Sequence, residues 1–491
     1  MIRHQLVAGL LVLLLGACTS LPPGSSRAPA TTGLPVSVVN MLNAANIPAN
    51  AVGAVVFRLS DATTLLSHRP DASMQPGSNM KLVTTLVGLE KLGPTFRTRT
   101  EMRTVAPIDD GVLRGDLILR GSGDGDFTWE EFSRMLQTLR EKGIRDIHGD
   151  LVLDRTLFQP TRIDVGVPSF DESPESEDNV IPDALLINTN LLKMEFESDD
   201  QFIRARLRPE LDAVSIDMKM TLVDRACKDW DDGWQTPLST NSTDGSIRIQ
   251  LRGEYPRKCS SSTNINILDR DDQISRLFRA LWIGQGGSFR GSVREGTMPA
   301  DARLLAQHRS RTLADTLRII NKPSDNALAR VLLLTLGSQS DSGSGTSLER
   351  AERIVRAWFK QNLISDDGLV LENGSGLSRS ERIRPSQLAA LLTAGYRSQW
   401  APEFVSSLPI AGMDGTMSLR LKGSPAQGRA RLKTGTLKNV VALSGYVPDA
   451  SGQMHVVAAF INHHPASGFL GRTGRPILDA LVDWVARSGG Q

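Results

Sequence analysis

Three short motifs contain the side chains of this chain with the clearest chemical potential. They occur in the order Ser78-Asn79-Met80-Lys81, Ser324-Asp325-Asn326 and Lys433-Thr434-Gly435. A serine hydroxyl is a weak nucleophile that needs an adjacent base, and a lysine amine becomes such a base once it is uncharged. The set therefore predicts acyl transfer through a serine nucleophile.

The spacing of the first motif brings a hydroxyl and an amine to one helix face. Apolar residues recur three and four positions apart over 80–89, which predicts a helix. Residues i and i+3 are neighbours on a helix, so Ser78 and Lys81 can meet at its N-terminus, where negative charge is favoured. We expect burial and the ammonium of Lys433 to lower the pKa of Lys81. A serine here could also be a simple N-cap, but capping does not explain the other motifs.

The third motif predicts a strand beside that helix. Lys433 would point into a cleft, and Gly435 would let a substrate approach the strand edge. The backbone N–H groups of Ser78 and Thr436 form the predicted oxyanion hole, in which one donor typically lowers the barrier by about 3 kcal/mol. Taken alone, Lys433 would be an ordinary surface lysine, and S-x-N also occurs at 239–241 and 262–264. The prediction therefore depends on the ordered set.

The surrounding sequence predicts the elements that position these motifs. Apolar segments separated by turn residues predict strands over 51–57, 63–67, 431–437, 440–447 and 454–462. Helical periodicity occurs over 304–320, 324–336, 348–361, 385–396 and 475–487. The block over 98–300 is β-rich, with one helical interval near 129–142 and an acidic segment, 169–179, that predicts an exposed loop. We expect an antiparallel sheet from both chain ends, flanked by helices, with this block inserted.

The N-terminus predicts export. Arg3-His4 precede an apolar run over 6–15 that is too short to span a bilayer but fits a signal peptide over 1–17. Leu15-Gly16-Ala17-Cys18 resembles a lipobox, in which Cys18 would be lipidated; ordinary signal-peptide cleavage nearby is the alternative. Residues 18–35 are rich in Pro, Gly, Ser and Thr and predict a tether. We expect a periplasmic protein held at a membrane by a lipid anchor.

Length, charge and cysteine content narrow the function classes further. A chain of 491 residues predicts two to four domains. Lys and Arg number 56 against 54 Asp and Glu, without a long basic run, so no nucleic-acid partner is expected. In an exported protein we expect Cys227 and Cys259 to form a disulfide, with two free thiols as the alternative. His463-His464 has no further ligands at metal-site spacing, so we expect no metal site.

The three motifs together resemble those of penicillin-binding proteins and class A β-lactamases. Further segments resemble the class C low-molecular-mass penicillin-binding proteins, the D-Ala-D-Ala carboxypeptidase/endopeptidase family of the penicillin-binding protein 4 type. These segments are 76–82, 119–124, 149–154, 373–379, 433–436 and 443–446. The resemblance implies an α/β (α+β) fold, with a penicillin-binding/β-lactamase-like transpeptidase domain over 36–97 and 301–491. It also implies one or two nested β-rich domains over 98–300.

The same resemblance implies roles for particular residues. Ser78 would attack the D-Ala-D-Ala bond of peptidoglycan peptides and form an acyl-enzyme, with Lys81 as the base. Ser324 and Lys433 would pass a proton to the leaving amine, and Asn326 would bind the substrate backbone. Other implied substrate-binding residues are Thr434, Gly435 and Thr436 near the terminal carboxylate, and Asp154 and Arg379 near the third stem-peptide residue. β-Lactams would acylate Ser78, and no metal or organic cofactor is implied.

Two other functions are compatible with the sequence. A β-lactamase-like hydrolase would keep all three motifs, but it needs fast deacylation, and no convincing deacylating glutamate motif follows the second motif. A catalytically silent envelope protein that binds peptidoglycan would not need the motifs intact. The sequence leaves open whether the bond cleaved is a terminal D-Ala, a cross-link or both.

Overall fold

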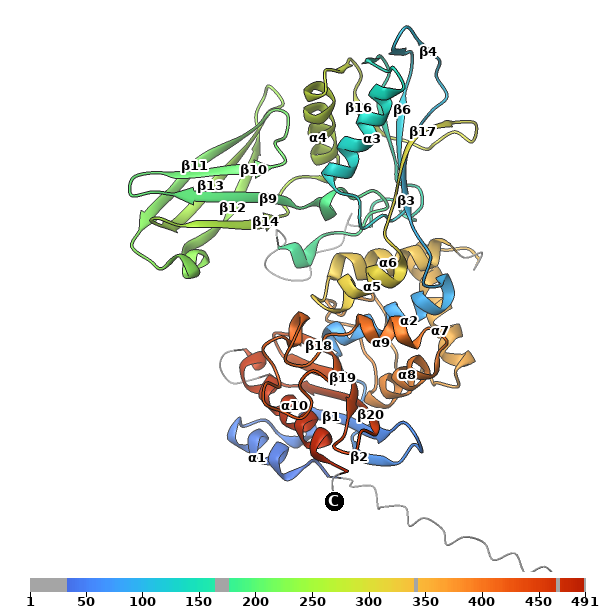
Figure 1. Cartoon of the computed structure of the whole chain (residues 1–491), viewed down its shortest axis with the longest axis vertical. Coiled ribbons are helices and arrows are strands. Elements are labelled where there is room, and N and C mark those ends of the chain that lie inside the picture. Colours follow the sequence, from blue (N-terminus) through green and yellow to red (C-terminus); the bar gives the residue numbers. More distant parts are fainter. Residues whose placement is uncertain (1–32, 164–175, 340–342, 465–468, 490–491) are drawn as a thin grey trace, which may run out of the picture.

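The two ends of the chain meet in one five-stranded antiparallel sheet (Figure 1). The computed structural model describes residues 33–163, 176–339, 343–464 and 469–489, so the predicted signal peptide, Cys18 and most of the tether lie outside it. The two central strands from the C-terminal part are almost wholly buried, because helices cover both sheet faces. The strand order is β18 (Arg431–Leu437), β19 (Val440–Pro448), β20 (Met454–Asn462), β1 (Val52–Arg58) and β2 (Thr64–His68).

Helices form an apolar layer on each face of this sheet. On one face α1 (Val36–Ala44) and α10 (Leu470–Arg487) pack against inward-facing residues such as Val441 and Leu443. On the other face the central helix α2 (Lys81–Leu92) is buried over most of its length. Around it pack α5 (Leu313–Asn321), α6 (Asn326–Ser338), α7 (Ser347–Gln361), α8 (Pro385–Arg397) and α9 (Ala401–Ser407). In the described residues no helix is both long and apolar enough to cross a membrane.

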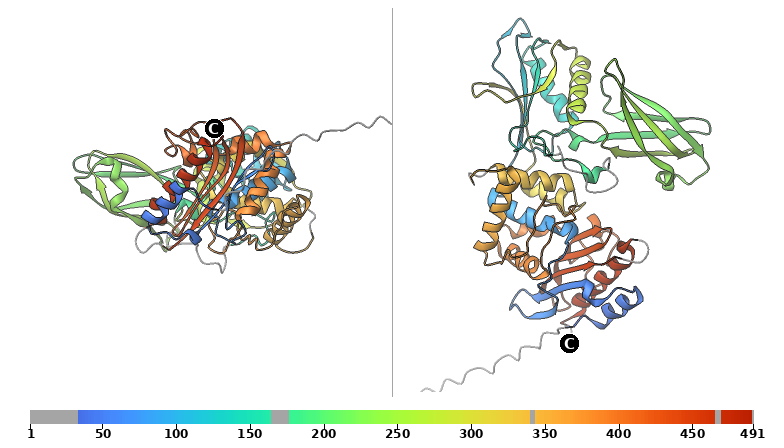
Figure 2. Two further views of the ribbon diagram at one scale, coloured as in Figure 1. Left: turned by 90° about the horizontal axis from the view of Figure 1, so that it is seen from below. Right: turned by 180° about the vertical axis from the view of Figure 1, so that it is seen from behind.

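The middle of the chain forms an inserted block, residues 98–309, above the helical layer (Figures 1 and 2). Its larger sheet has the order β16 (Val293–Glu295), β8 (Leu151–Asp154), β6 (Leu117–Gly121), β3 (Arg99–Thr104) and β17 (Arg303–Arg309). A smaller sheet has the order β15 (Ser288–Phe289), β7 (Asp146–Ile147), β5 (Val112–Leu113) and β4 (Ile108–Asp109). Two helices pack with them, α3 (Trp129–Glu141) and α4 (Arg270–Gly284).

A second, nested unit projects sideways from the inserted block, as Figure 1 and the right-hand view of Figure 2 show. Its two three-stranded sheets enclose an aromatic cluster that includes Phe196, Trp234 and Tyr255. The sheets are built from β9 (Leu192–Ser198), β10 (Ile203–Arg208), β14 (Ser260–Ile265), β11 (Val214–Val223), β12 (Trp234–Asn241) and β13 (Ile247–Pro256). A disulfide joins Cys227, in the 3-10 turn that precedes β12, to Cys259, the residue before β14.

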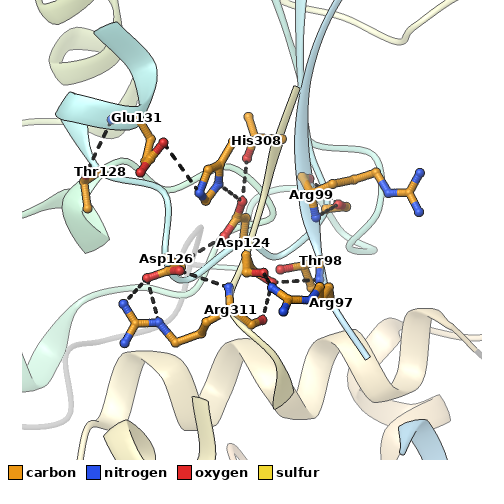
Figure 3. Close-up of polar contacts among 12 residues, drawn as sticks. Arg97, Thr98, Arg99, Asp124, Asp126, Thr128, Glu131, His308 and Arg311 are labelled. Atoms are coloured by element: carbon orange, nitrogen blue, oxygen red, sulfur yellow. Dashed lines mark hydrogen bonds and ion pairs between the residues drawn. The ribbon is translucent and has the colours of Figure 1, made fainter. Parts of the chain in front are cut away.

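The inserted block and the sheet domain are connected by two chain crossings, before β3 and after β17. Figure 3 shows the polar contacts at this junction. Arg311 Nε donates to Asp126 Oδ1 at 2.8 Å, and the ring of His308 is 2.8 Å from Asp124. Both aspartates come from the turn after β6, so this Gly-rich turn holds the junction together.

The predicted fold class is confirmed, but several elements differ from the prediction, and the helices α1 and α9 were not predicted. The segment 304–320 was predicted as one helix; its first part is the strand β17, which pairs with β3, and α5 begins only at Leu313. The helix α4 was not predicted, although Asp269 caps it and apolar residues recur at helical spacing. The error in 304–320 has a non-local cause, because the pairing partner lies at the far end of the insertion.

Removing the disulfide should destabilise the nested unit. A bond that closes a loop of 32 residues contributes about 3–4 kcal/mol to the free energy of unfolding by the chain-entropy estimate. Replacing Cys227 and Cys259 by serine should therefore lower the unfolding temperature reported by the fluorescence of the nearby tryptophans. Dithiothreitol should reproduce the shift in the wild type and have no effect on the double variant. Equal unfolding temperatures for the two proteins would contradict the prediction.

Candidate active site

The first motif forms a tight turn that continues directly into α2. A 3-10 turn spans Gly77–Met80, and α2 begins at Lys81. The Nζ atom of Lys81 lies 3.0 Å from Ser78 Oγ, as the i, i+3 spacing predicts. Lys81 is completely buried, whereas Ser78 is partly exposed and lines a cleft.

The surroundings of Lys81 make its amine a base at neutral pH. Burial lowers the pKa of Lys81 from its usual 10.5 to about 7, although the carboxylates of Asp325, Glu381 and Asp178 raise it. Its Nζ also lies 2.5 Å from Asn326 Oδ1 and 2.6 Å from the carbonyl oxygen of Ser375. The neutral amine has two hydrogens, which these two acceptors can take. Its lone pair is then available for the hydroxyl hydrogen of Ser78.

The second motif lies at the start of α6, across the cleft. The side chain of Asp325 caps this helix by accepting a hydrogen bond from Leu328 N at 2.8 Å. Ser324 precedes the cap with a φ of 75°, a left-handed conformation that is costly for a serine and is typical of functional turns. Asn326 is the first residue of α6, and its amide group reaches Lys81.

The third motif lies on β18, at the edge of the sheet. The Nζ atom of Lys433 donates hydrogen bonds to Ser324 Oγ at 2.8 Å and to the carbonyl oxygen of Thr434 at 2.9 Å. Burial lowers the pKa of Lys433 well below its usual value, and the charge of Lys81 lowers it further. The sequence predicted the converse, that Lys433 lowers the pKa of Lys81. At Lys81 burial lowers the pKa as predicted, but the charges that also shift it are those of the three carboxylates named above and not that of Lys433. Repulsion between two ammonium groups still disfavours protonation of both amines at once.

Close glycine contacts bring the two predicted oxyanion donors together. A Cβ atom added to Gly435 would lie 3.1 Å from Ser78 N, and one added to Gly77 would lie 3.3 Å from Thr436 N. The N-terminal turn of α2 and the strand β18 can pack this tightly only because both positions lack a side chain. The structure therefore places the backbones of Ser78 and Thr436 side by side.

Two sequence-predicted substrate residues do not line this cleft. Asp154 is buried at the end of β8, where its carboxylate accepts hydrogen bonds from the backbone N–H groups of Thr156 and Met298. Arg379 is exposed, and its carbonyl oxygen accepts a hydrogen bond from Arg382 at 2.7 Å. Their predicted contacts with the third stem residue remain predictions.

Several residues at the cleft were not identified from the sequence. The cleft has a volume of about 370 Å³, and side chains from separate parts of the chain line it. Asp178, predicted to lie in an exposed loop, accepts a hydrogen bond from Asn326 Nδ2 at 3.0 Å. No local pattern could have shown this, because the inserted block supplies the carboxylate. The other residues that line it are Pro323, Leu377, Thr416, Arg420, Leu437 and Arg475.

A buried glutamate organises the loop that contacts Lys81. One carboxylate oxygen of Glu381 accepts the backbone N–H groups of Glu372, Asn373 and Gly374, and the other accepts that of Gly376. Burial raises the pKa of Glu381, while these backbone N–H groups act in the opposite direction. This carboxylate fixes the loop over 372–376. The carbonyl oxygen of Ser375, in the same loop, accepts a hydrogen bond from the amine of Lys81.

Substituting this glutamate should destabilise the loop. In Glu381→Gln one acceptor oxygen becomes an N–H donor, so at least one buried backbone N–H loses its partner at a cost of about 1–3 kcal/mol. We expect urea unfolding to show this loss of stability. Glu372→Gln is a matched control, because that exposed carboxylate contacts only serine hydroxyls in the same loop. Equal stability of the two variants would disprove the role assigned to Glu381.

Comparisons with known proteins identify the family. The chain is 28% identical over 452 residues to a D-alanyl-D-alanine carboxypeptidase of an Actinomadura species, covering 89% of this chain and 81% of that protein. It is 25% identical over 433 residues to D-alanyl-D-alanine carboxypeptidase DacB of Haemophilus influenzae, covering 87% of this chain and 88% of that protein.

A solved structure shows the same fold. The crystal structure of penicillin-binding protein 4 (dacB) from Haemophilus influenzae has a TM-score of 0.76 at 22% identity, and the match covers 92% of this chain and all of that one. The family model of the D-Ala-D-Ala carboxypeptidase 3 (S13) family matches residues 36–487. The resemblance predicted from the motifs is confirmed, and the chain belongs to the D-Ala-D-Ala carboxypeptidase 3 (S13) family.

Proposed function

We propose that this protein is a serine-type D-alanyl-D-alanine carboxypeptidase or endopeptidase that acts on peptidoglycan stem peptides and is inhibited by β-lactams. One observation carries the proposal: Lys81 Nζ lies 3.0 Å from Ser78 Oγ in a setting that lowers its pKa to about 7. The Lys433–Ser324 pair completes the arrangement from the other side of the cleft. A silent peptidoglycan-binding protein would gain nothing from two fully buried lysine amines, because burying them costs stability.

Acylation begins at the hydroxyl of Ser78. As Lys81 takes its proton, Oγ attacks the carbonyl carbon of the scissile bond, and the developing oxyanion is stabilised by the backbone N–H groups of Ser78 and Thr436. The tetrahedral intermediate then expels the leaving amine, which receives a proton through Ser324 from the Lys433 side. Water then attacks the carbonyl carbon of the acyl-enzyme and gives one proton to the Lys433 side through Ser324. Lys81 returns its proton to Ser78 Oγ as the peptide acid is released, which restores the hydroxyl.

Substrate binding is proposed for side chains beside these groups. Asn326 binds the peptide backbone through its amide, which contacts both Lys81 and the cleft. Thr434 and Thr436 both line the cleft, next to Gly435 on β18, and bind the terminal carboxylate with Lys433. The hydroxyl of Thr434 is itself held 2.7 Å from Thr416 Oγ1, which fixes its direction.

We further propose that the protein works in the periplasm and is anchored there through a lipid on Cys18. The apolar run over 6–15 and the lipobox-like residues that follow support export and lipidation. The disulfide in the nested unit is consistent with an oxidising compartment.

Covalent labelling by penicillin tests the nucleophile directly. Protein that lacks residues 1–32 should gain the mass of one penicilloyl group and release D-Ala from a D-Ala-D-Ala peptide. Ser78→Ala should abolish both, because it removes the hydroxyl that forms the acyl-enzyme. Intact-protein mass spectrometry and a D-Ala assay provide the two readouts. Persistent labelling of the alanine variant would overturn the assignment.

The acylation rate should depend on pH through the amine of Lys81. Because the base must be neutral, the second-order rate constant for penicillin acylation should rise with pH, with a midpoint near the pKa of about 7. The carboxylate of Asp178 raises that pKa, so Asp178→Asn should move the midpoint to lower pH while keeping an acceptor for Asn326.

Lys81→Arg is the control for this experiment. A guanidinium stays protonated over the whole range, so this variant should show no acylation at any pH tested. A midpoint that does not move in Asp178→Asn would contradict the electrostatic role of Asp178. Substantial acylation by Lys81→Arg would contradict the role of Lys81 as the base.

A further inference from the structure

The cleft contains two arginines that belong to none of the three motifs. Arg475, on the second turn of α10, and Arg420 line the same cleft as Ser78 and Thr436. Lys81 and Lys433 are both buried, and each is bonded to a motif residue. The arginines therefore provide a separate positive charge at the open side of the cleft.

A hydrogen bond places Arg475 next to the predicted reaction centre. Its Nη2 donates to Thr436 Oγ1 at 3.3 Å. Thr436 directly follows Gly435, at which an added Cβ would lie only 3.1 Å from Ser78 N. The guanidinium of Arg475 is thus one side chain away from the predicted oxyanion hole, on the β18 side of the cleft.

The two arginines differ in how their charges are balanced. Arg420 forms an ion pair with Asp479, with 2.7 Å between Nη2 and Oδ1. No carboxylate of the described residues lies within ion-pair distance of Arg475. Burial and the charge of Arg420 lower the pKa of Arg475, and the more distant carboxylate of Asp479 raises it. The only hydrogen bond of its five donors that the structure records is the one to Thr436. An anion bound in the cleft would supply a counter-charge in direct contact with the guanidinium.

We infer that Arg475 binds the free α-carboxylate of the D-residue that leaves in the reaction. This inference rests on the proposed function, in which that carboxylate adjoins the scissile amide on the side of Thr436. A guanidinium and a carboxylate form strong charge-assisted hydrogen bonds, whereas a neutral C-terminal amide lacks the charge. Arg475 therefore selects peptides that end in a free carboxylate, whereas the charge of Arg420 is already balanced by Asp479.

Two substrates that differ in one group test this inference. The experiment compares kcat/KM for a D-Ala-D-Ala peptide and for the same peptide with a C-terminal amide. Arg475→Gln should lower kcat/KM for the acid by about 10- to 100-fold, the usual effect of losing a charged hydrogen bond, and change that for the amide by less than about twofold. Arg475→Lys should retain part of the preference for the acid, because it keeps the charge.

Arg472→Gln is the matched control, since Arg472 is an exposed arginine on the first turn of the same helix. It should leave the acid-to-amide ratio unchanged. An unchanged ratio in Arg475→Gln, or an equal loss on both substrates, would overturn the inference. Benzylpenicillin and its methyl ester allow the same comparison for acylation rates. A wild type that neither cleaves the acid peptide nor is acylated by penicillin would overturn the proposed function itself.

Discussion

The structure depends on the burial of two lysine amines within one small site. A buried ammonium lacks the solvation of water, so the pKa of both amines falls, and their mutual repulsion disfavours two charges at once. Each amine is nevertheless fully provided with polar partners. Lys81 contacts a hydroxyl, an amide oxygen and a carbonyl oxygen, while Lys433 contacts a hydroxyl and a carbonyl oxygen. The site can thus hold one proton where it is useful while both amines keep their hydrogen-bond partners.

Holding two ionisable amines close together requires a rigid frame, and the fold supplies it from opposite sides. Lys81 begins a helix that is enclosed by five others, and Lys433 lies on a strand of the sheet. The two supports touch through Gly77 and Gly435, and a buried hydrogen bond of 2.8 Å between Asn79 Nδ2 and Ser444 Oγ joins the turn to the neighbouring strand β19. Rigidity of this kind keeps the amines from separating and regaining water.

The sequence was sufficient to predict this centre because its residues lie in short motifs with helical or strand spacing. Ser78 and Lys81 meet through one helical turn, and the two strands over 440–448 and 454–462 are largely apolar. What could not be predicted comes from long-range contacts. Asp178 comes from the inserted block. Arg475 lies on α10, and the apolar periodicity of that helix indicates only which of its residues are buried. Glu381 was missed because an isolated glutamate shows no sign of the backbone groups that surround it.

The pairing of β1 with β20 has a consequence for how the chain becomes active. β1 lies near the N-terminus and is a central strand of the sheet, yet its partner is among the last strands to be synthesised. Contacts so distant in sequence form late and slowly. Ser78 is therefore synthesised long before the strand that holds Lys433, and a partly synthesised chain carries the hydroxyl without the second amine. The hydrolase becomes competent only after both ends of the sheet have been synthesised and have folded together.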